Sequence, residues 1–305
     1  MDLSIVIVSF NTRDILRNCL KSIYEKTKGI EFEVVVSDNN STDGSLNMIE
    51  EEFPEVILIK NNTNIGFSSA NNLGFYIARG RFVLALNPDT VILNSALTTM
   101  VQFMNNRPEA GVSGCKLLNE DGTLQPSWGN FPNILSEIFY STFLNRIFTH
   151  SKRIDRGDFY EVDWVMGAFI MVRKEVIEKT GVFDEDYNPV YSEEVDWCYR
   201  IKKSGWKIYY YPGAEVIHLA GQSTKKRPLW AMLLLHRNKY LFFKKNYSRI
   251  YADAYRIIRI GIYAILIIFI FIMGLFSRSE RDLLQQKWKL LVLFLHPDLK
   301  IPTNC

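Results

Sequence analysis

Cysteine is scarce in this chain, and its four residues are scattered at Cys19, Cys115, Cys198 and Cys305. Because none forms a CxxC pair, neither a zinc site nor a disulfide framework is indicated, and a reducing compartment is expected. Charge of either sign is also in little excess: the net charge is +3, and no basic stripe with stacking aromatics runs through the first half. Nucleic acid is therefore not expected as a partner. The start lacks the basic and small-residue features of a signal peptide, so we expect the N-terminal part to stay in the cytosol.

The residues that are present describe a globular chain. Apolar residues make up 48% and charged residues 23% of the 305 residues, which excludes a disordered protein. This length allows one large α/β domain with an appendage, or two small domains.

Residues 1–125 alternate between short apolar runs and helical patterns. Four runs predict strands: Ile5–Val8, Val34–Val36, Val56–Ile59 and Phe82–Leu86. Three patterns between them predict helices: Ile15–Ile23, Leu46–Phe53 and Phe67–Ala78. Such alternation is typical of βαβ units, so we expect an α/β fold with a mostly parallel central sheet and flanking helices.

A second block follows, from residue 126 to residue 225. Pro126–Asp163 is irregular and rich in aromatics, and we expect a loop and helix insertion beside the site. The remaining pattern predicts a strand, two helices and a strand, at Ala168–Val172, Lys174–Lys179, Glu194–Lys203 and Lys207–Tyr211. We therefore divide residues 1–225 into halves of 1–125 and 126–225 within one domain.

Residues 226–305 have a different composition. Ile257–Phe276 contains one charge, Arg259, and the uncharged part from Ile260 is at the short end of what spans a bilayer, where about 20 residues are usual. The neighbours Trp230–Phe243 and Trp288–Leu295 mix aromatics with basic residues, as interfacial helices do. We expect a helical, membrane-associated region; the alternative is a buried core helix. Basic residues flank both sides, so the sequence leaves open whether the segment spans the bilayer or lies within it.

Leu86–Thr90 closes the strand that begins near Phe82. Pro88 cannot donate a ladder hydrogen bond, so the strand should stop there and Asp89 should project from its tip. Ligands bind at the carboxyl ends of strands in open α/β sheets. A carboxylate in this place is a candidate ligand for a divalent cation that carries a diphosphate. The alternative is that Asn-Pro-Asp is only a turn.

Polar residues also follow the first two strands, in Ser9–Asn11 and in Ser37–Ser45. Clustered at adjacent strand tips before a helix, they suit a nucleotide, whose phosphates the helix dipole favours. Capping by Asp43 or Ser45 is the alternative, but it leaves Asp38 unexplained.

Taken together, these motifs resemble a family 2 glycosyltransferase with the GT-A fold, most closely its rhamnosyltransferase-like branch. The resemblance covers about residues 1–225 and is carried by Ser4–Asn11, Asp38–Ser45, Asn64–Asn72 and Leu86–Asp89. It implies that Asp38 contacts the base or ribose and that Asp89 binds Mg²⁺ or Mn²⁺ on the donor diphosphate. Asn87 stands where many relatives have an acid, so it can offer only a neutral oxygen. The implied set for the nucleotide sugar is Ser9, Asn11, Asp38, Asn40, Asn71, Asn87 and Gly167.

The family's acceptor side and acidic motif are matched by Trp164–Ala168 and Tyr191–Cys198. Relatives have Glu-Asp where this chain has Glu193-Glu194, and the second acid is the base that takes the acceptor's proton. We therefore predict Glu194 as the base, with Glu193 and Asp196 as neighbours whose charge could raise its pKa. The alternative is that these acids complement the dipole of a helix capped by Ser192.

His218 follows the Lys207–Tyr211 strand, where relatives place a second metal ligand, and neutral imidazole suits Mn²⁺. A lone histidine is more often structural. The segment Gln222–Arg227 is interpreted either as a loop that closes over the diphosphate or as a solvated basic loop.

The resemblance implies an inverting, metal-dependent transferase that moves a sugar from a nucleotide-sugar donor, with dTDP-L-rhamnose as the first candidate. The expected acceptor is a lipid-linked or membrane-proximal glycan, met at the cytoplasmic face of the inner or plasma membrane during cell-surface polysaccharide synthesis. Transfer of galactofuranose, glucose or GlcNAc is an alternative. A catalytically idle nucleotide- or glycan-binding membrane partner is a rival from another class.

Overall fold

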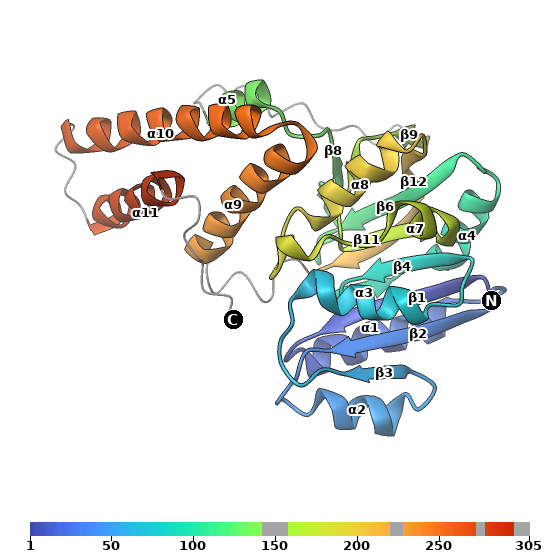
Figure 1. Cartoon of the computed structure of the whole chain (residues 1–305). Helices are drawn as coiled ribbons and strands as arrows, with labels where there is room; N and C mark the ends of the chain where they lie inside the picture. The colour runs from blue at the N-terminus through green and yellow to red at the C-terminus, as the bar shows by residue number, and fades with distance from the viewer. Residues whose placement is uncertain (142–157, 220–227, 273–277, 296–305) are drawn as a thin grey trace. The chain divides into compact units, whose positions relative to one another are not determined.

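The computed structural model describes residues 1–141, 158–219, 228–272 and 278–295, in two compact units (Figure 1). Unit 1 comprises Met1–Phe131 with Arg153–Gln222, and unit 2 comprises Pro132–Lys152 with Ser223–Cys305. The described residues 132–141 therefore group with the C-terminal helices, whereas the sequence pattern predicts that they belong to the half 126–225 of the first domain.

The first part of unit 1 consists of alternating strands and helices. The elements are β1 (Leu3–Ser9), α1 (Arg13–Lys26), β2 (Phe32–Asp38), α2 (Ser45–Glu52), β3 (Ile57–Lys60), α3 (Phe67–Ile77) and β4 (Phe82–Leu86). Strand β1 pairs in parallel with β2 and β4, and β2 pairs in parallel with β3. The α/β alternation predicted for this part is confirmed.

The second part of unit 1 adds strands that make the sheet mixed. Its elements are β5 (Thr90–Ile92), α4 (Ala96–Asn105), β6 (Ala110–Leu118), β7 (Leu124–Gln125), β8 (Trp128–Gly129), β9 (Tyr160–Glu161), β10 (Trp164–Val165), β11 (Phe169–Arg173), α7 (Lys174–Thr180), α8 (Glu193–Lys203) and β12 (Lys207–His218). The order is β3-β2-β1-β4-β11-β6-β12-β5. Strand β11 runs antiparallel to both β4 and β6. The expectation of a mostly parallel sheet missed this inserted strand and the short β5, and also the extension of β12 to His218.

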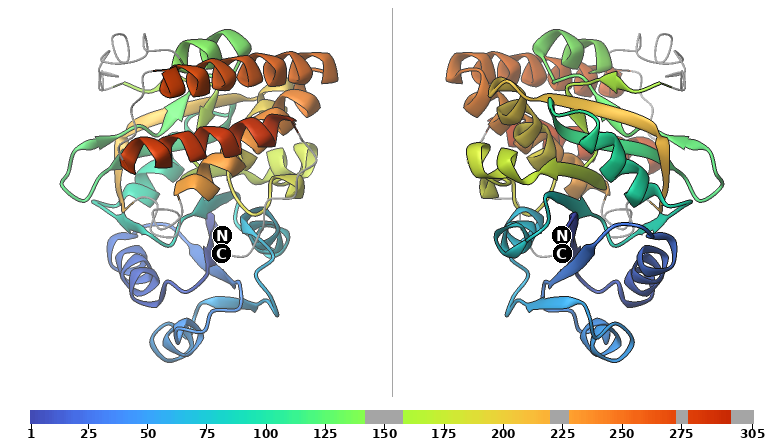
Figure 2. Two further views of the ribbon diagram at one scale, coloured as in Figure 1. Left: turned by 90° about the vertical axis from the view of Figure 1, so that its left-hand side faces the viewer. Right: turned by 90° about the vertical axis from the view of Figure 1, so that its right-hand side faces the viewer.

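Helices cover both faces of the sheet because successive strand residues point to opposite sides. On one face, Ile5 and Ile7 of β1 pack with Leu16 and Leu20 of α1 and with residues of α2 and α4. On the other face, Val6 of β1 joins a cluster with residues of α3, α7 and α8. Figure 2 shows α1 and α3 on opposite sides of the strands. The fully buried strands therefore contain near-continuous apolar runs, as strands covered on both faces do.

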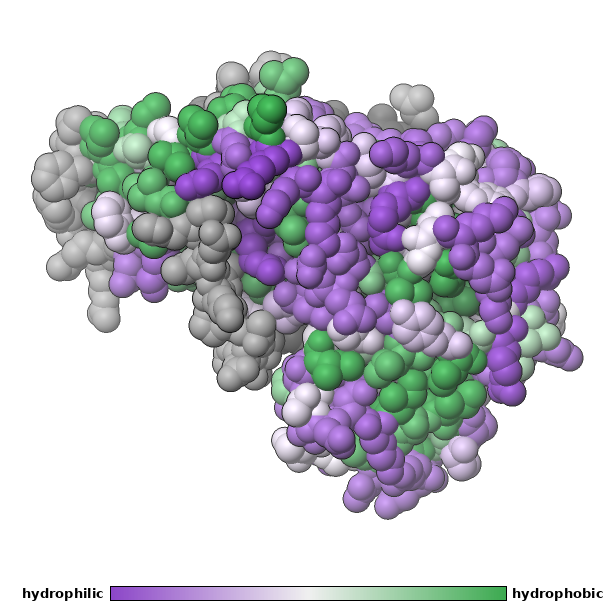
Figure 3. Space-filling view, in the orientation of Figure 1, coloured by the Kyte–Doolittle hydropathy of each residue, from purple (hydrophilic) through white to green (hydrophobic). Residues whose placement is uncertain are grey.

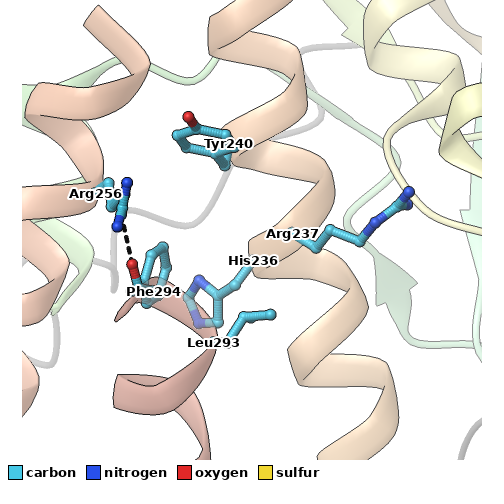
Figure 4. A pocket seen from close by; sticks show the side chains of 6 residues that line it. All are labelled: His236, Arg237, Tyr240, Arg256, Leu293 and Phe294. Atoms are coloured by element: carbon cyan, nitrogen blue, oxygen red, sulfur yellow. Dashed lines mark hydrogen bonds between the residues drawn. The ribbon is translucent and has the colours of Figure 1, made fainter. Parts of the chain in front are cut away.

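Unit 2 is helical in its described part, with α5 (Ile134–Ser141), α9 (Pro228–Asn246), α10 (Arg249–Ile272) and α11 (Arg278–Leu295). Helix α10 holds the end of α11, because Arg256 donates to the carbonyls of Phe294 at 2.5 Å and Leu295 at 3.0 Å. A cation is well placed there, since the last carbonyls of a helix lack partners within it. Next to this contact lies a small cavity, which is also lined by His236, Arg237, Tyr240 and Leu293 (Figure 4).

Helix α10 exposes a row of apolar residues. Its exposed stripe contains Ile257, Ile265, Ile268 and Phe269, and Figure 3 shows apolar residues over this helix. Its buried stripe contains Arg259, whose guanidinium lies 3.2 Å from His236 Nε2. The buried stripe also contains Ala252, Tyr255 and Tyr263, so α10 is apolar on both its buried and its exposed side, unlike a helix whose outer face is polar.

No helix among the described residues is both long and apolar enough to cross a membrane. Residues 273–276 of the predicted segment Ile257–Phe276 lie outside the described part of the chain.

Candidate active site

The carboxyl ends of β1, β2 and β4 lie at one edge of the sheet. Ser9 pairs with Asp38 in the β1–β2 register, and Ile7 pairs with Leu86 in the β1–β4 register. The polar residues after β2 and the Asn-Pro-Asp segment after β4 therefore emerge at the same edge, as the strand pattern predicted.

Asp38 organises the loop that follows β2. The residue is fully buried, and its two carboxylate oxygens accept from the Ser41 backbone N–H at 2.8 Å and the Ser41 hydroxyl at 2.6 Å. Asn11 accepts from Thr42 N–H at 2.8 Å and so ties the loop to the end of β1. Asn11 and Asn40 are exposed and have left-handed φ of 53° and 65°. Asn40, on this loop, and Asn11, after β1, thus present two amides at the sheet edge. A contact of Asp38 with base or ribose stays a prediction.

Asp43 caps the starts of two helices, α1 and α2. The sequence pattern predicted that it would cap only one. Its Oδ1 accepts from Ser45 N–H at 3.0 Å, at the start of α2. Its Oδ2 accepts from Arg13 N–H at 2.8 Å, at the start of α1. Both bonds satisfy amides that have no partner within their helices.

Two further predicted donor-site residues are part of the framework. Ser9 is buried and its hydroxyl lies 3.2 Å from the Thr12 hydroxyl. Asn71 lies within α3 and donates to the Phe67 carbonyl at 3.0 Å. These contacts describe their positions and leave their predicted binding roles as predictions.

Asp89 and His218 meet at the predicted cation position. They are 8% and 6% exposed, and His218 Nε2 lies 3.3 Å from Asp89 Oδ1. The backbone holds them together, because Leu219 N–H donates to the Asp89 carbonyl at 2.9 Å and His218 pairs with Thr90. Asn87 joins them, with its Nδ2 3.5 Å from His218 Nε2.

These residues fit a divalent cation that is shared with a diphosphate. Asn87 Oδ1 is buried without a hydrogen-bond partner among the described residues, and such an oxygen is a neutral ligand for Mg²⁺ or Mn²⁺. No group of three or more His, Cys, Asp or Glu side chains in that part of the chain could hold a metal alone. Such cations often use only one or two protein ligands and take the rest from phosphate oxygens and water.

Glu193 and Glu194 begin α8 with buried, unsatisfied carboxylate oxygens. The Oε2 atom of each is inaccessible to solvent and has no hydrogen-bond partner among the described residues. Ser192 makes no side-chain capping bond, so the capping alternative is not seen at this residue. Tyr191 and Ser192 have left-handed φ of 84° and 70°, a conformation that costs energy for residues other than glycine.

Burial raises the pKa of both acids. The pKa of Glu194 rises to about 7 because its carboxylate is desolvated. Desolvation and the charge of Glu194 raise the pKa of Glu193 well above its usual range. The sequence predicts that neighbouring charge raises the pKa of Glu194, but desolvation is the cause. A carboxyl group with a pKa near 7 can both hold and release a proton at neutral pH.

Asp196 is engaged elsewhere. Tyr187 donates its hydroxyl to Oδ1 at 3.1 Å, and Arg200 donates Nε–H to Oδ2 at 2.8 Å. Both contacts are made by a carboxylate that is almost fully buried. Asp196 thus stabilises the α8 region, and a catalytic part for it stays a prediction.

The cation residues and the acidic pair are connected through β4 and β11. Asn87 N–H donates to the Ala168 carbonyl at 3.0 Å, just before β11. The preceding residue is Gly167, where an added Cβ would lie 3.6 Å from Glu194 Cβ and 3.9 Å from Glu194 Cδ. The missing side chain therefore leaves space beside the Glu194 carboxylate. Strand pairing brings together two groups that are about 100 residues apart in sequence.

Two further residues, which no sequence motif indicates, hold the site together. Asn188 accepts from Ser68 N–H at 3.1 Å and donates to the Ser69 hydroxyl at 2.7 Å, at the start of α3. Gln125 contacts His218 Nδ1 at 2.6 Å. Both contacts are long-range, so no local pattern could identify them. The predicted loop Gln222–Arg227 lies outside the described residues.

Residues 4–181 match Glycosyl transferase family 2, which is more than half of the chain. A similar curated protein is N-acetylglucosaminyl-diphospho-decaprenol L-rhamnosyltransferase of Mycobacterium tuberculosis (strain ATCC 25618 / H37Rv), 27% identical over 81% of this chain and 85% of that protein. Rhamnosyltransferase WbbL of Escherichia coli (strain K12) is 24% identical over 81% of this chain and 97% of that protein.

Two solved structures resemble the fold. TarS 1-349 of S. aureus in complex with UDP-GlcNAc has a TM-score of 0.58 at 16% identity, covering 99% of this chain and 82% of that chain. Mannosyltransferase PcManGT from Pyrobaculum calidifontis, in complex with GDP-Man and Mn²⁺, has a TM-score of 0.58 at 15% identity, covering 97% and 88%. The fold is a mixed GT-A-like sheet with flanking helices. The chain belongs to glycosyl transferase family 2, with rhamnosyltransferase-like relatives, and is a hexosyltransferase.

Proposed function

We propose that this enzyme is an inverting, metal-dependent transferase that moves rhamnose from dTDP-L-rhamnose to a lipid-linked acceptor in cell-surface polysaccharide synthesis. The observation that carries the proposal is the connection at β4 and β11. There the Asn87–Ala168 hydrogen bond holds the cation residues next to the Gly167–Glu194 contact. An acid with a raised pKa beside a diphosphate-binding position is what direct displacement at an anomeric carbon requires.

Glu194 is assigned as the base. Its carboxylate takes the proton of the acceptor hydroxyl as that oxygen forms a bond to the anomeric carbon. The bond from that carbon to the nucleoside diphosphate breaks on the opposite face, so the configuration inverts. Glu193 is the neighbouring buried acid, and the charge of Glu194 helps to raise its pKa, so Glu193 is expected to stay protonated beside the base.

Asp89 and His218 are assigned to the cation, and Asn87 contributes its neutral oxygen. When bound, the cation neutralises charge that develops on the diphosphate leaving group. Asn40 is exposed on the Asp38-organised loop and Asn11 is exposed just after β1, so we assign both to the nucleotide. The Mn²⁺ in the PcManGT complex and the UDP-GlcNAc in the TarS complex support these assignments by similarity of fold.

The donor and acceptor classes rest on the relatives. The mycobacterial protein is named for a decaprenol-diphosphate acceptor and for rhamnose, and the Escherichia coli protein is also named for rhamnose. The similar Campylobacter jejuni protein, named for a different sugar and an undecaprenol-linked acceptor, makes the acceptor class better supported than the sugar.

A donor panel tests this proposal. The enzyme, Mn²⁺ and a polyprenyl-diphosphate-linked sugar are incubated separately with dTDP-L-rhamnose, UDP-galactofuranose, UDP-glucose and UDP-GlcNAc. We expect nucleotide release and product formation with dTDP-L-rhamnose, and a product whose anomeric configuration is opposite to that of the donor. Turnover with another donor alone would contradict the rhamnose assignment, and retained configuration would contradict the mechanism.

We further propose that unit 2 attaches the enzyme to the cytoplasmic face of the membrane through α10, lying along the surface. The apolar stripe of α10 supports this, since Ile257 and Ile265 are each 68% exposed while Arg259 is buried. Trp288, 56% exposed on α11, is a residue type favoured at membrane interfaces.

Vesicle sedimentation tests the attachment. The paired change Ile265→Glu and Ile268→Glu should reduce binding to anionic vesicles, because two charges would enter the apolar layer. Tyr76→Glu is the control, since Tyr76 is 70% exposed on α3 of unit 1. Equal binding of the paired variant and the control would contradict attachment through α10.

A further inference from the structure

His218 has two ring nitrogens with different environments. Nε2 faces Asp89 Oδ1 at 3.3 Å, and Nδ1 lies 2.6 Å from Gln125 Oε1. Only an unprotonated nitrogen has a lone pair for a cation. Whether Nε2 can serve therefore depends on whether Nδ1 carries the ring proton, and the partner of Nδ1 decides this.

The orientation of the Gln125 amide is determined by its two donor bonds. Its Nε2 donates to Asn119 Oδ1 at 3.0 Å and to the His218 carbonyl at 3.3 Å. Both acceptors are oxygens, so the amino group must face them and the carbonyl oxygen must face the imidazole. Gln125 is 8% exposed, so water cannot readily replace these partners.

The direction of this bonding can be traced back to a surface carboxylate. Asp121 is exposed and can only accept, so the Thr123 hydroxyl, 2.6 Å from Asp121 Oδ1, must donate to it. The Thr123 oxygen then accepts from Asn119 Nδ2 at 2.9 Å. This contact turns Asn119 Oδ1 toward Gln125. Asp121, Thr123, Asn119, Gln125 and His218 thus form a series of hydrogen bonds, in which the direction of each bond fixes the direction of the next.

We propose that the turn Asn119–Gln125 positions His218, holding Nδ1–H donated to Gln125 and leaving the Nε2 lone pair for a cation that His218 shares with Asp89. Gln125 is the positioning residue. Asp121, which can only accept, fixes the donor-to-acceptor direction of the whole hydrogen-bond series. The inference rests on the proposed cation site. It adds a determinant that lies outside the cation's own ligands, because partners of a metal-binding histidine commonly set its tautomer and orientation.

Nitrogen NMR on ¹⁵N-histidine-labelled full-length enzyme reads the tautomer without any metal. The chain has four histidines, so His218 can be assigned by comparison with a His218→Gln variant. We expect the Nδ1–H form in the wild type. Gln125→Leu should shift the ring toward the Nε2–H form. Thr123→Val, at an exposed turn, should do so partially. Glu120 is an exposed acid of the same turn that is not part of the hydrogen-bond series, so Glu120→Ala should leave the His218 tautomer unchanged.

Binding of Mn²⁺ with dTDP, followed by electron paramagnetic resonance, is the second readout. Affinity should fall roughly 10–100-fold in Gln125→Leu and stay unchanged in Glu120→Ala. A wild-type ring in the Nε2–H form, or an unchanged tautomer in Gln125→Leu, would overturn the inference. If the tautomer responds as expected while Asp89→Asn leaves Mn²⁺ binding intact, the positioning role stands and the proposed cation site is overturned.

Discussion

At the scale of single residues, the site depends on carboxylates in unlike environments. Asp196 is satisfied by a tyrosine and an arginine, whereas Glu194, on the same helix, keeps a buried oxygen without a partner among the described residues. Buried polar groups are normally bonded, so an unsatisfied acid at a helix start indicates that a substrate group or a proton is its partner.

Glu194→Gln keeps the shape of the side chain but removes its ability to accept a proton. We expect kcat to fall roughly 10²–10⁴-fold, the range for a positioned base. Donor affinity should change little, because the cation and nucleotide residues are elsewhere. Glu178→Gln, exposed on α7, is the control. A larger loss of kcat in Glu193→Gln than in Glu194→Gln would move the base by one residue.

The wild-type rate should depend on pH through the same group. Because the pKa of Glu194 is raised to about 7, the active, deprotonated base accumulates as the pH rises through about 7. We expect kcat to increase with pH and to reach half of its plateau near pH 7. A rate that stays level down to pH 5 would show that the base has an ordinary carboxyl pKa.

Asp89→Asn preserves size and one oxygen but removes the charge. We expect the Mn²⁺-dependent part of dTDP binding to weaken roughly tenfold or more, while metal-free binding stays the same. Calorimetry with and without Mn²⁺ separates these parts, and Asp14→Asn, an exposed acid of α1, is the comparison. Unchanged Mn²⁺-dependent affinity would remove Asp89 from the cation site.

At the scale of elements, α3 connects the donor edge to the acidic helix. Its first turn is held from outside: Phe67 N–H donates to the Pro189 carbonyl at 2.9 Å, and Ser68 N–H donates to Asn188. Farther along α3, the ring of Phe75 stacks on Trp197 of α8, with ring centroids 5.4 Å apart. The loop before the acidic pair therefore doubles as the N-terminal cap of α3.

Gly66→Ala tests this connection. Gly66 has φ of 90°, and an added Cβ would lie 2.4 Å from Asn188 Oδ1, so the cap would have to move. Gly29→Ala is the matched control, because Gly29 has φ of 75° with no atom within 4 Å of the new Cβ. Both variants incur backbone strain, but Gly66→Ala should lose at least about 1 kcal/mol more in unfolding free energy. Equal losses in denaturant titrations would mean that the Asn188 contact adjusts freely.

At the scale of the whole molecule, burial of the acidic pair costs stability above neutral pH. The folded pKa of Glu194, about 7, exceeds its ordinary value of 4.5, so the folded state binds the proton more tightly. The contribution of Glu194 to the free energy of unfolding is therefore fully present below pH 4.5. It is lost between about pH 4.5 and pH 7, and the protein stays less stable above pH 7. The catalytic residue thus opposes the stability of the fold that holds it.

Glu194→Gln should therefore stabilise the full-length enzyme at pH 8 by of order 1–3 kcal/mol and have little effect at pH 4.5. For a chain of this size, a change of 1 kcal/mol corresponds to a rise in Tm of about 2–4 °C. Thermal unfolding at both pH values is the measurement. A Tm that rises equally at pH 4.5 and pH 8 would show that the stabilisation does not come from removing the ionised carboxylate, and would contradict the prediction.

The sequence by itself determined the early strands and helices and the gathering of Asp38 and Asp89 at one edge of the sheet. Apolar periodicity acts over a few residues, and parallel strands necessarily bring their carboxyl ends together. It could not place β11 between β4 and β6, because antiparallel insertion leaves the strand's own pattern unchanged. Nor could it reveal the Gln125–His218 or Asn188–Ser68 contacts, whose partners are 93 and 120 residues apart. The raised pKa of Glu194 also required tertiary structure, because desolvation depends on what packs around the carboxylate.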